Sequence, residues 1–263
     1  MANAHHVLGI DVGASGIKGA IVDTHAGTLL TERLRVPTPS PATPKAMTAA
    51  FCELVGQFDY GGDHVGVGFP AIVRRGLAMS AANIHPDWIR TSVSELWGKA
   101  IGKRVHALND ADAAGLASVS YGSARRERGV VVFLTIGTGI GSAVFIDGAL
   151  VPNTELGHIY MPNGMKSEHY ASNRIRKTLD LDWTTWGERF DEVLAQVDRV
   201  FSPDLILLGG GASKKFDLFE ECLNVSCPVR PAKFRNEAGA IGAALYAAEK
   251  AGIVEDLSAT VNI

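Results

Sequence analysis

The chain has 263 residues, of which 46% are hydrophobic and 20% charged, a composition typical of a globular protein with one or two domains. Its formal net charge of −3 at pH 7 argues against broad nucleic-acid binding, because domains that bind nucleic acids in that way are usually basic. The cysteine count of 3 without a Cys-x-x-Cys pair, and the lack of a signal-peptide pattern before residue 7, predict a cytoplasmic protein.

The first predicted elements are strands at residues 6–11, 17–24 and 28–36, which we interpret as an antiparallel meander. The turn between the first two strands combines an acid, small residues and a lysine. The residues that carry this signal are Asp11, Gly13, Ser15 and Lys18. An aspartate at a strand end can hold hydrated Mg²⁺, the small residues let a phosphate approach the backbone, and Lys18 can neutralise it. The alternative is a polar hairpin whose lysine is simply solvated.

The next stretch, residues 37–101, is predicted to complete this first unit. Residues 37–44 are rich in proline and predict an extended connector, which leads to a helix over 45–58. A strand over 64–69 contains Gly68, residues 71–76 pair with those that follow, and a helix covers 92–101. Asn83 lies in a polar loop, where its amide could bind a sugar hydroxyl as donor and acceptor, although turn formation is the simpler interpretation.

A second informative pattern follows the strand predicted over residues 104–108, where Asn109 and Asp110 precede an alanine-rich helix. Asp110 is placed where it can cap that helix. A carboxylate at the carboxyl end of a strand is also where a general base would lie. The residues alone leave both interpretations open.

The most distinctive stretch is an apolar strand over 131–136 that breaks at Gly137-Thr138-Gly139, before a return strand over 142–146 and a short strand at 150–151. Glycine lets a ligand lie against bare backbone, successive amides in such a turn can point at an anion, and Thr138 adds a hydroxyl. The spacing is neither that of a Rossmann turn nor that of a P-loop, and a tight hairpin is the alternative. The run over 130–146 is too short and too interrupted for a membrane span. Because this order repeats that of the N-terminus, we predict an internal duplication.

A polar group follows the second meander. Glu155 and His158 are three residues apart, and Glu168 and His169 lie a short distance further on, where Glu168 begins a predicted helix over 168–179. Such residues could be metal ligands, an acid–base pair or a clamp for hydroxyl groups, and the spacing does not decide between these roles.

The last part of the chain contains a helix over 184–201 with apolar residues at helical spacing, a buried strand over 204–208 and helices over 216–223 and 237–251. A third glycine turn at a strand end suits a phosphate or nucleotide, and two lysines add charge beside it. These residues are Gly210, Gly211, Lys214 and Lys215. The patterns together predict a two-lobed α/β phosphotransferase or nucleotide hydrolase with a cleft between the lobes. We expect domains of residues 1–109 and 110–263, with the last helix as an element that could pack back on the first domain.

Several motifs recur in a fixed order along nearly the whole chain, namely Asp11-x-Gly13-x-Ser15, Asn109-Asp110, Gly137-Thr138-Gly139-x-Gly141, Glu155-x-Gly157-His158 and Gly209-Gly210-Gly211. This set resembles the ROK family of sugar kinases, which belongs to the actin–hexokinase–Hsp70 superfamily. The resemblance implies the actin-like ATPase fold, which is related to ribonuclease H, with two duplicated α/β lobes. The turn at Asp11, the segment 38–44, Phe201-Ser202-Pro203-Asp204 and the lysine pair resemble the bacterial polyphosphate glucokinases of that family.

By this resemblance, Asp110 would be the general base that takes the proton from the sugar 6-hydroxyl. The residues that would hold other parts of the sugar are Gly68, Asn83, Asn109, Glu155, His158 and Glu168. The turns at Asp11 and Gly137 would hold the transferred phosphoryl group and Mg²⁺, which Asp11 would reach through water. The residues expected along the nucleotide or polyphosphate path are Gly210, Gly211, Lys214 and Lys215. The implied reaction takes a phosphoryl group from inorganic polyphosphate, ATP or both to glucose, with mannose as a further candidate acceptor.

The same resemblance indicates which alternative functions and metal sites must be considered. Many ROK proteins follow the Gly-His pair with a zinc-binding cysteine cluster, but residues 161–171 contain no cysteine, so we expect no zinc site. An ATP-only ROK hexokinase is the main alternative. A sugar-responsive regulator would need a DNA-binding segment before Val7, which we do not expect, and a chaperone-like ATPase would not need the Glu155 and His158 clamp. No nucleic-acid or membrane partner is expected, and the choice between monomer and homodimer stays open.

Overall fold

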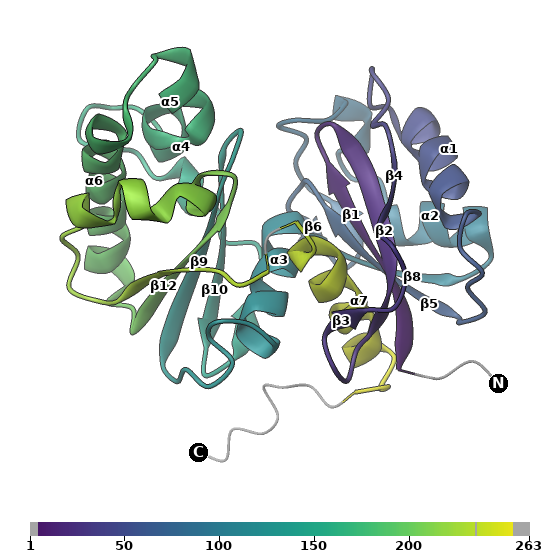
Figure 1. The fold of residues 1–263 in the computed structure, drawn as a ribbon. Helices are drawn as coiled ribbons and strands as arrows, with labels where there is room; N and C mark the ends of the chain where they lie inside the picture. Colours follow the sequence, from purple (N-terminus) through teal and green to yellow (C-terminus); the bar gives the residue numbers. More distant parts are fainter. Residues whose placement is uncertain (1–4, 235, 255–263) are drawn as a thin grey trace. The chain divides into compact units, whose positions relative to one another are not determined.

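The computed structural model describes residues 5–234 and 236–254, and the chain folds as two compact units (Figure 1). The first unit comprises residues 1–121 and 237–263, and the second comprises residues 122–236. Each unit is built on its own mixed sheet.

The sheet of the first unit has the strand order β3-β2-β1-β5-β8, with β4 also paired to β2. Its strands are β1 (His6–Gly13), β2 (Gly16–Asp23), β3 (Thr28–Leu29), β4 (Leu34–Val36), β5 (His64–Phe69) and β8 (Arg104–Asn109). β1 and β2 are antiparallel, whereas β5 and β8 run parallel to β1. The predicted single strand over 28–36 is wrong, because residues 30–33 leave the ladder and divide it into β3 and β4, each paired separately with β2.

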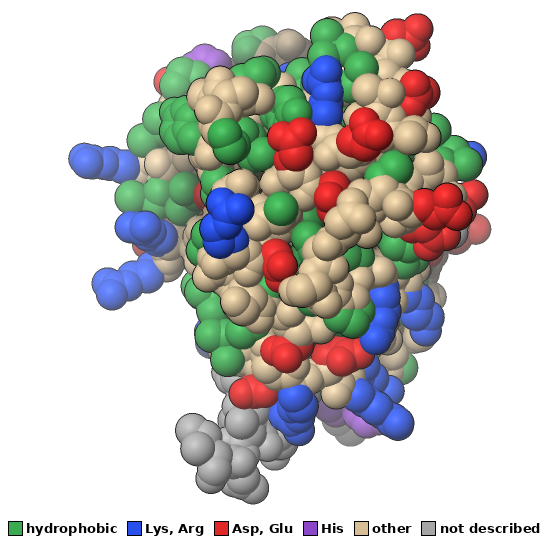
Figure 2. All heavy atoms as spheres, turned by 90° about the vertical axis from the view of Figure 1, so that its left-hand side faces the viewer, with side chains coloured by type: hydrophobic (Ala, Val, Ile, Leu, Met, Phe, Trp, Pro, Cys, Tyr) green, Lys and Arg blue, Asp and Glu red, His purple; other side chains and the backbone are tan. Residues whose placement is uncertain are grey.

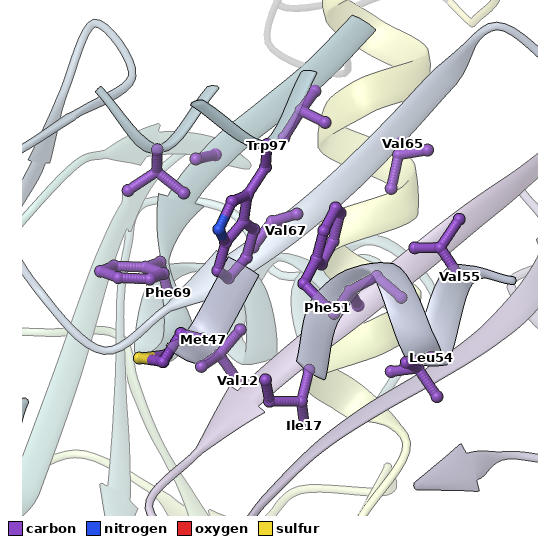
Figure 3. Packing of buried hydrophobic residues seen from close by; sticks show 14 of the residues in the cluster. Val12, Ile17, Met47, Phe51, Leu54, Val55, Val65, Val67, Phe69 and Trp97 are labelled. Atoms are coloured by element: carbon purple, nitrogen blue, oxygen red, sulfur yellow. The ribbon is translucent and has the colours of Figure 1, made fainter. Parts of the chain in front are cut away.

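One face of this sheet is covered by α1 (Pro44–Val55) and α2 (Val93–Ile101). Thr43 caps α1 and a proline occupies its first turn, so the proline-rich connector ends where the helix begins. Figure 3 shows the core that results, in which Phe51 of α1 stacks on Trp97 of α2 with ring centroids 4.2 Å apart. A short hairpin of β6 (Val73–Arg74) and β7 (Leu77–Ala78) and the 3-10 turn η1 (Pro86–Trp88) adjoin this layer.

The other face is covered by α7 (Ala238–Lys250), on which α3 (Asp110–Ser120) packs. The approach is close: a side chain at Gly9 of β1 or Gly66 of β5 would overlap the backbone of α7, so glycine is required at both positions. Because α3 and α7 pack together and α7 lies on the first sheet, both helices belong to the first unit. The observed boundary therefore falls after Tyr121, rather than after Asn109 as the sequence suggested.

The sheet of the second unit has the order β11-β10-β9-β12-β13. Its strands are β9 (Val130–Ile136), β10 (Ile140–Ile146), β11 (Ala149–Val151), β12 (Leu205–Gly210) and β13 (Val229–Pro231). The first three are antiparallel neighbours, and β12 and β13 run parallel to β9. The first sheet has the same succession of antiparallel and then parallel neighbours, so the predicted duplication of an α/β unit is confirmed.

The long helix α6 (Trp183–Phe201) packs its apolar stripe on the second sheet, and Asp182 caps it by accepting from Thr185 N at 2.8 Å. The helix predicted over 168–179 is instead two short helices, α4 (Ser167–Ala171) and α5 (Asn173–Thr178), separated by an extended Ser172. The helix predicted over 216–223 is wrong as well. Its residues form the 3-10 turns η3 (Ala212–Leu218) and η4 (Glu220–Cys222), divided at Phe219, whose buried ring lies 4.9 Å from that of Trp186.

Figure 2 shows one face of the molecule, on which acidic and basic groups are interspersed among neutral and hydrophobic ones, so this face has no continuous basic surface. Among the helices of residues 5–234 and 236–254, none is long and apolar enough to cross a membrane.

Candidate active site

The turn between β1 and β2 is the first part of the candidate site. Asp11 and Lys18 are direct cross-strand partners, and Lys18 Nζ lies 3.7 Å from Asp11 Oδ2, with side-chain exposures of 24% and 22% for the lysine and the aspartate respectively. Burial raises the pKa of the Asp11 carboxyl above its ordinary value, while the charge of Lys18 acts in the opposite direction. Gly13 and Ser15 lie in the same tight turn, so the predicted acid, lysine and small residues are brought together.

Two further side chains hold this turn from outside. Thr38 Oγ1 donates to Gly13 O at 2.6 Å, and the guanidinium of Arg35 donates to Ser15 O. Both contacts turn carbonyl oxygens of the loop toward donors. An anion in the turn would therefore meet fewer exposed negative dipoles. Sequence reasoning missed both residues, because their contact with the turn depends on the pairing of β4 with β2.

The junction of β8 and α3 carries the candidate general base. Asn109, rather than Asp110, is the N-cap: its Oδ1 accepts from Ala111 N at 2.8 Å and from Asp112 N at 3.1 Å. Asp110 occupies the first helical position, half-buried, and its Oδ1 accepts from Ala111 N at 2.9 Å. The carboxylate thus lies in the first turn of a helix, where the helix dipole interacts favourably with a negative charge.

The side chain of Asn109 is largely committed to the scaffold. Besides its two cap bonds, its Nδ2 donates to Ala71 O at 3.1 Å. An asparagine amide has two N–H donors, so at most one donor is left for a sugar hydroxyl. Gly68 has a packing role here as well, because a Cβ at this position would lie 3.2 Å from Ala113 Cβ and 3.5 Å from Asp110 Cα. Asn83 is an exposed loop residue of the same unit.

In the second unit, the turn between β9 and β10 is closed by a bond from Gly137 N to Gly139 O at 3.0 Å. A Cβ at Gly137 would have open space around it, and Thr138 is exposed. In contrast, a Cβ at Gly139 would overlap Oε2 of Glu168. The glycine turn therefore adjoins the carboxylate of Glu168 directly.

His158 lies between two carboxylates. Its Nδ1 is 3.8 Å from Glu155 Oε2, and its Nε2 is 3.5 Å from Glu168 Oε1. Burial raises the pKa of Glu155 above its ordinary value, although the neighbouring His158 acts in the opposite direction; the charge of Glu168 also raises it. Carboxylates accept and imidazole N–H groups donate, so the three residues offer both kinds of hydrogen bond to a polyol. His169 approaches the same Glu168 oxygen at 3.6 Å but is 52% exposed in its side chain.

Local packing explains the spacing of this cluster. Glu155 precedes the 3-10 turn η2 (Leu156–His158), in which a Cβ at Gly157 would overlap Ile140 O, so only glycine lets η2 lie against β10. Ser167 Oγ then donates to Leu156 O at 2.8 Å and ties the start of α4, which carries Glu168, to the same turn. Glu155, His158 and Glu168 are thereby brought together although His158 and Glu168 are ten positions apart in the sequence.

The third glycine turn follows β12. Gly210 has φ of 80°, and a Cβ there would lie 2.6 Å from the backbone N and O of Ile136, so it also permits a close approach to β9. Gly211 is exposed, and a Cβ there would be 3.5 Å from Asn173 Nδ2. Lys214 and Lys215 are both exposed on η3, and Lys214 Nζ lies 3.4 Å from Asn236 Oδ1.

Among residues 5–234 and 236–254, no group of three or more His, Cys, Asp and Glu side chains is placed to hold a metal ion. The segment after His158 instead forms a small hairpin, in which Met161 N donates to Met165 O at 2.8 Å and Tyr160 bridges to Lys166.

Comparison with known proteins identifies close relatives. The model of the ROK family matches residues 7–174. The chain is 42% identical over 241 residues to a polyphosphate glucokinase of Mycobacterium tuberculosis, covering 91% of this chain and 90% of the relative. The polyphosphate glucokinase of Mycobacterium leprae is 39% identical, covering 92% of this chain and 74% of the relative. The crystal structure of an inorganic polyphosphate/ATP-glucomannokinase from Arthrobacter sp. strain KM superimposes with a TM-score of 0.89 at 42% identity, covering 93% of this chain and 99% of that one.

Proposed function

The chain belongs to the ROK family, and we propose that it is a sugar kinase that transfers a phosphoryl group from inorganic polyphosphate, ATP or both to the 6-hydroxyl of glucose. The names of its mycobacterial and Arthrobacter relatives support this reaction. The observation that carries it is the contact of Gly139 with Glu168. It joins a turn suited to phosphate to a cluster suited to hydroxyl groups, as phosphoryl transfer to a sugar requires.

The acceptor site in this proposal is the cluster of Glu155, His158 and Glu168. A neutral sugar gives no charge to bind, so affinity and selectivity must come from directed hydrogen bonds to its hydroxyl groups. The two carboxylates accept from sugar hydroxyls, and the ring of His158 lies between them. By resemblance to the ROK sugar kinases, Asn83, Asn109 and the backbone at Gly68 are further candidates for sugar binding in the first unit. Mannose is a second acceptor because the Arthrobacter relative is named a glucomannokinase.

Asp110 serves as the general base. Its carboxylate takes the proton of the 6-hydroxyl as that oxygen forms a bond to the terminal phosphorus. The bond from this phosphorus to its bridging oxygen breaks at the same time, and the shortened polyphosphate or ADP leaves with the bond electrons. Proton removal of this kind contributes about 10²- to 10⁴-fold to the rate.

The β1–β2 turn binds the donor end. Lys18 neutralises charge on the transferred phosphoryl group, and the turn at Gly13 lets its oxygens approach the backbone. In the second unit, the turn at Gly137 is a further candidate for phosphate binding. The residues fit Mg²⁺ held through water, because Asp11 supplies a carboxylate that is 22% exposed beside the phosphate turn. Mg²⁺ would neutralise negative charge on the donor phosphates.

In the second unit, the third glycine turn is a further candidate for donor binding. Gly210 and Gly211 would lie at the nucleotide or along the polyphosphate, and the exposed lysines Lys214 and Lys215 would supply positive charge.

The cysteines Cys52, Cys222 and Cys227 are free thiols, in keeping with a kinase that works in the cytoplasm.

The experiment that tests the acceptor site measures steady-state kinetics of His158→Ala. We expect KM for glucose to rise at least tenfold with KM for the phosphoryl donor nearly unchanged. His25→Ala, which alters an exposed histidine in the β2–β3 turn of the first unit, is the matched control and should behave as wild type. A His158 variant with an unaltered KM for glucose would remove this cluster from the sugar site.

A further inference from the structure

A row of charged side chains crosses three neighbouring strands of the first unit. Asp11 on β1 is paired in register with Lys18 on β2, which is paired in turn with Arg35 on β4. Residues directly opposite one another in antiparallel strands project from the same face of a sheet. The carboxylate, the ammonium and the guanidinium therefore share one face of the sheet beside the β1–β2 turn, which we call the donor turn.

The pairing of Lys18 with Arg35 opposes two positive charges. Like charges placed directly opposite in a sheet destabilise it, so folding alone does not favour this pair. Arg33 adds another guanidinium close enough to lower the pKa of Asp11. Asp11 already lies beside Lys18, at 3.7 Å. The side of the turn that faces β4 thus carries more positive charge than one carboxylate balances.

Arg35 is held in place without losing its binding capacity. Its guanidinium donates to Ser15 O and lies over Gly16, where a Cβ would overlap it. A guanidinium has five N–H donors, and the bond to Ser15 uses one of them. The residue is exposed, so it lies at the rim of the turn rather than at its base. An anion that extends out of the turn would meet it.

We propose that Arg35 binds the phosphate chain of polyphosphate beyond the transferred group. This inference rests on the proposed function. Arginine binds phosphate oxygens in bidentate geometry, and polyphosphate offers the enzyme nothing except a row of phosphates. ATP also has a nucleoside that the enzyme can bind, so the affinity for ATP depends less on a cation at the rim of the turn. Arg35 is therefore a determinant of donor specificity.

The test compares Arg35→Ala and Arg35→Lys with wild type, using ATP and linear polyphosphates of defined chain length at saturating glucose. Arg35→Ala should raise KM for long-chain polyphosphate about tenfold and KM for ATP less than about threefold. Arg35→Lys should fall between, because it keeps the charge but loses the bidentate contact. Arg104→Ala is the matched control, since Arg104 is an exposed arginine at the other end of the same sheet, and it should match wild type.

The outcomes separate this inference from the proposed function. An equal loss with both donors would mean that Arg35 only braces the turn through Ser15, and an unchanged KM for polyphosphate would exclude it from the donor site. Either result overturns the inference while the kinase activity stands. If wild type uses ATP alone, long-chain polyphosphate is tested as an inhibitor of that reaction. Weaker inhibition of Arg35→Ala would support the arginine contact, and equal inhibition of both proteins would overturn it.

Discussion

Replacing Asp110 with asparagine separates chemistry from folding at the β8–α3 junction. Asn109 caps α3 through its own side chain, so the cap survives the change. The substituted amide would keep an oxygen that can accept from Ala111 N. What folding loses is one negative charge at a helix N-terminus, worth about 0.3–1 kcal/mol. The reaction loses its proton acceptor, so kcat should decrease about 10²- to 10⁴-fold, which corresponds to about 2.7–5.4 kcal/mol of transition-state stabilisation.

The assay is the initial rate of glucose 6-phosphate formation at saturating donor and glucose. Glucose affinity is measured separately by calorimetry, and the free energy of unfolding by urea titration. The matched control is Glu95→Gln, which makes the same chemical change in the first turn of α2. We expect Asp110→Asn to lose kcat, while both variants keep glucose affinity and stability within about 1 kcal/mol of wild type. A kcat within about threefold of wild type would refute the role of Asp110 as general base.

Three other predictions concern packing, pH and the donor. Gly157→Ala should raise KM for glucose and cost about 1–3 kcal/mol of stability, because its methyl group would overlap Ile140 O; unaltered kinetics would contradict this explanation of the spacing. Burial lowers the pKa of His64 and of His106, whose rings share a 2.9 Å contact, so the unfolded chain binds protons more readily. In urea titrations, the full contribution of this pair to the free energy of unfolding should be present above pH 6.5, the ordinary histidine pKa, and should decrease as the pH falls below it. A variant with glutamine at both positions should lose less stability at low pH. The same pH profile in that variant as in wild type would disprove the assignment to His64 and His106. Lys214→Ala should lower the activity with polyphosphate more than the activity with ATP. Equal decreases with both donors would mean that Lys214 is a solvated surface lysine outside the donor site.

Local signals explain what the sequence predicted well. Strand β5 matches its predicted residues 64–69, and the turns at Gly13 and Gly137 were located by their small residues. The long helix α6 was predicted within one residue at its start, because its apolar residues recur at helical spacing. Each of these features is determined by residues close together in the chain.

Tertiary contacts explain what the sequence did not predict. Phe219 interrupts a helical pattern because its ring is buried against Trp186, far away in the chain. The short strand β13 forms only because it pairs with β12, and no strand was predicted there. The same limit applies to the site. Arg35 reaches the donor turn through the β2–β4 register, and no motif around Arg35 indicates that contact.

The donor is identified most directly by glucose 6-phosphate formation from glucose and Mg²⁺ with long-chain polyphosphate, nucleotide being rigorously excluded, beside the same assay with ATP. We expect product with polyphosphate alone, at a rate that depends on both glucose and polyphosphate concentration. Product with ATP but none with polyphosphate would leave an ATP-dependent hexokinase of the same family. Absence of product with either donor would contradict the proposed kinase activity itself.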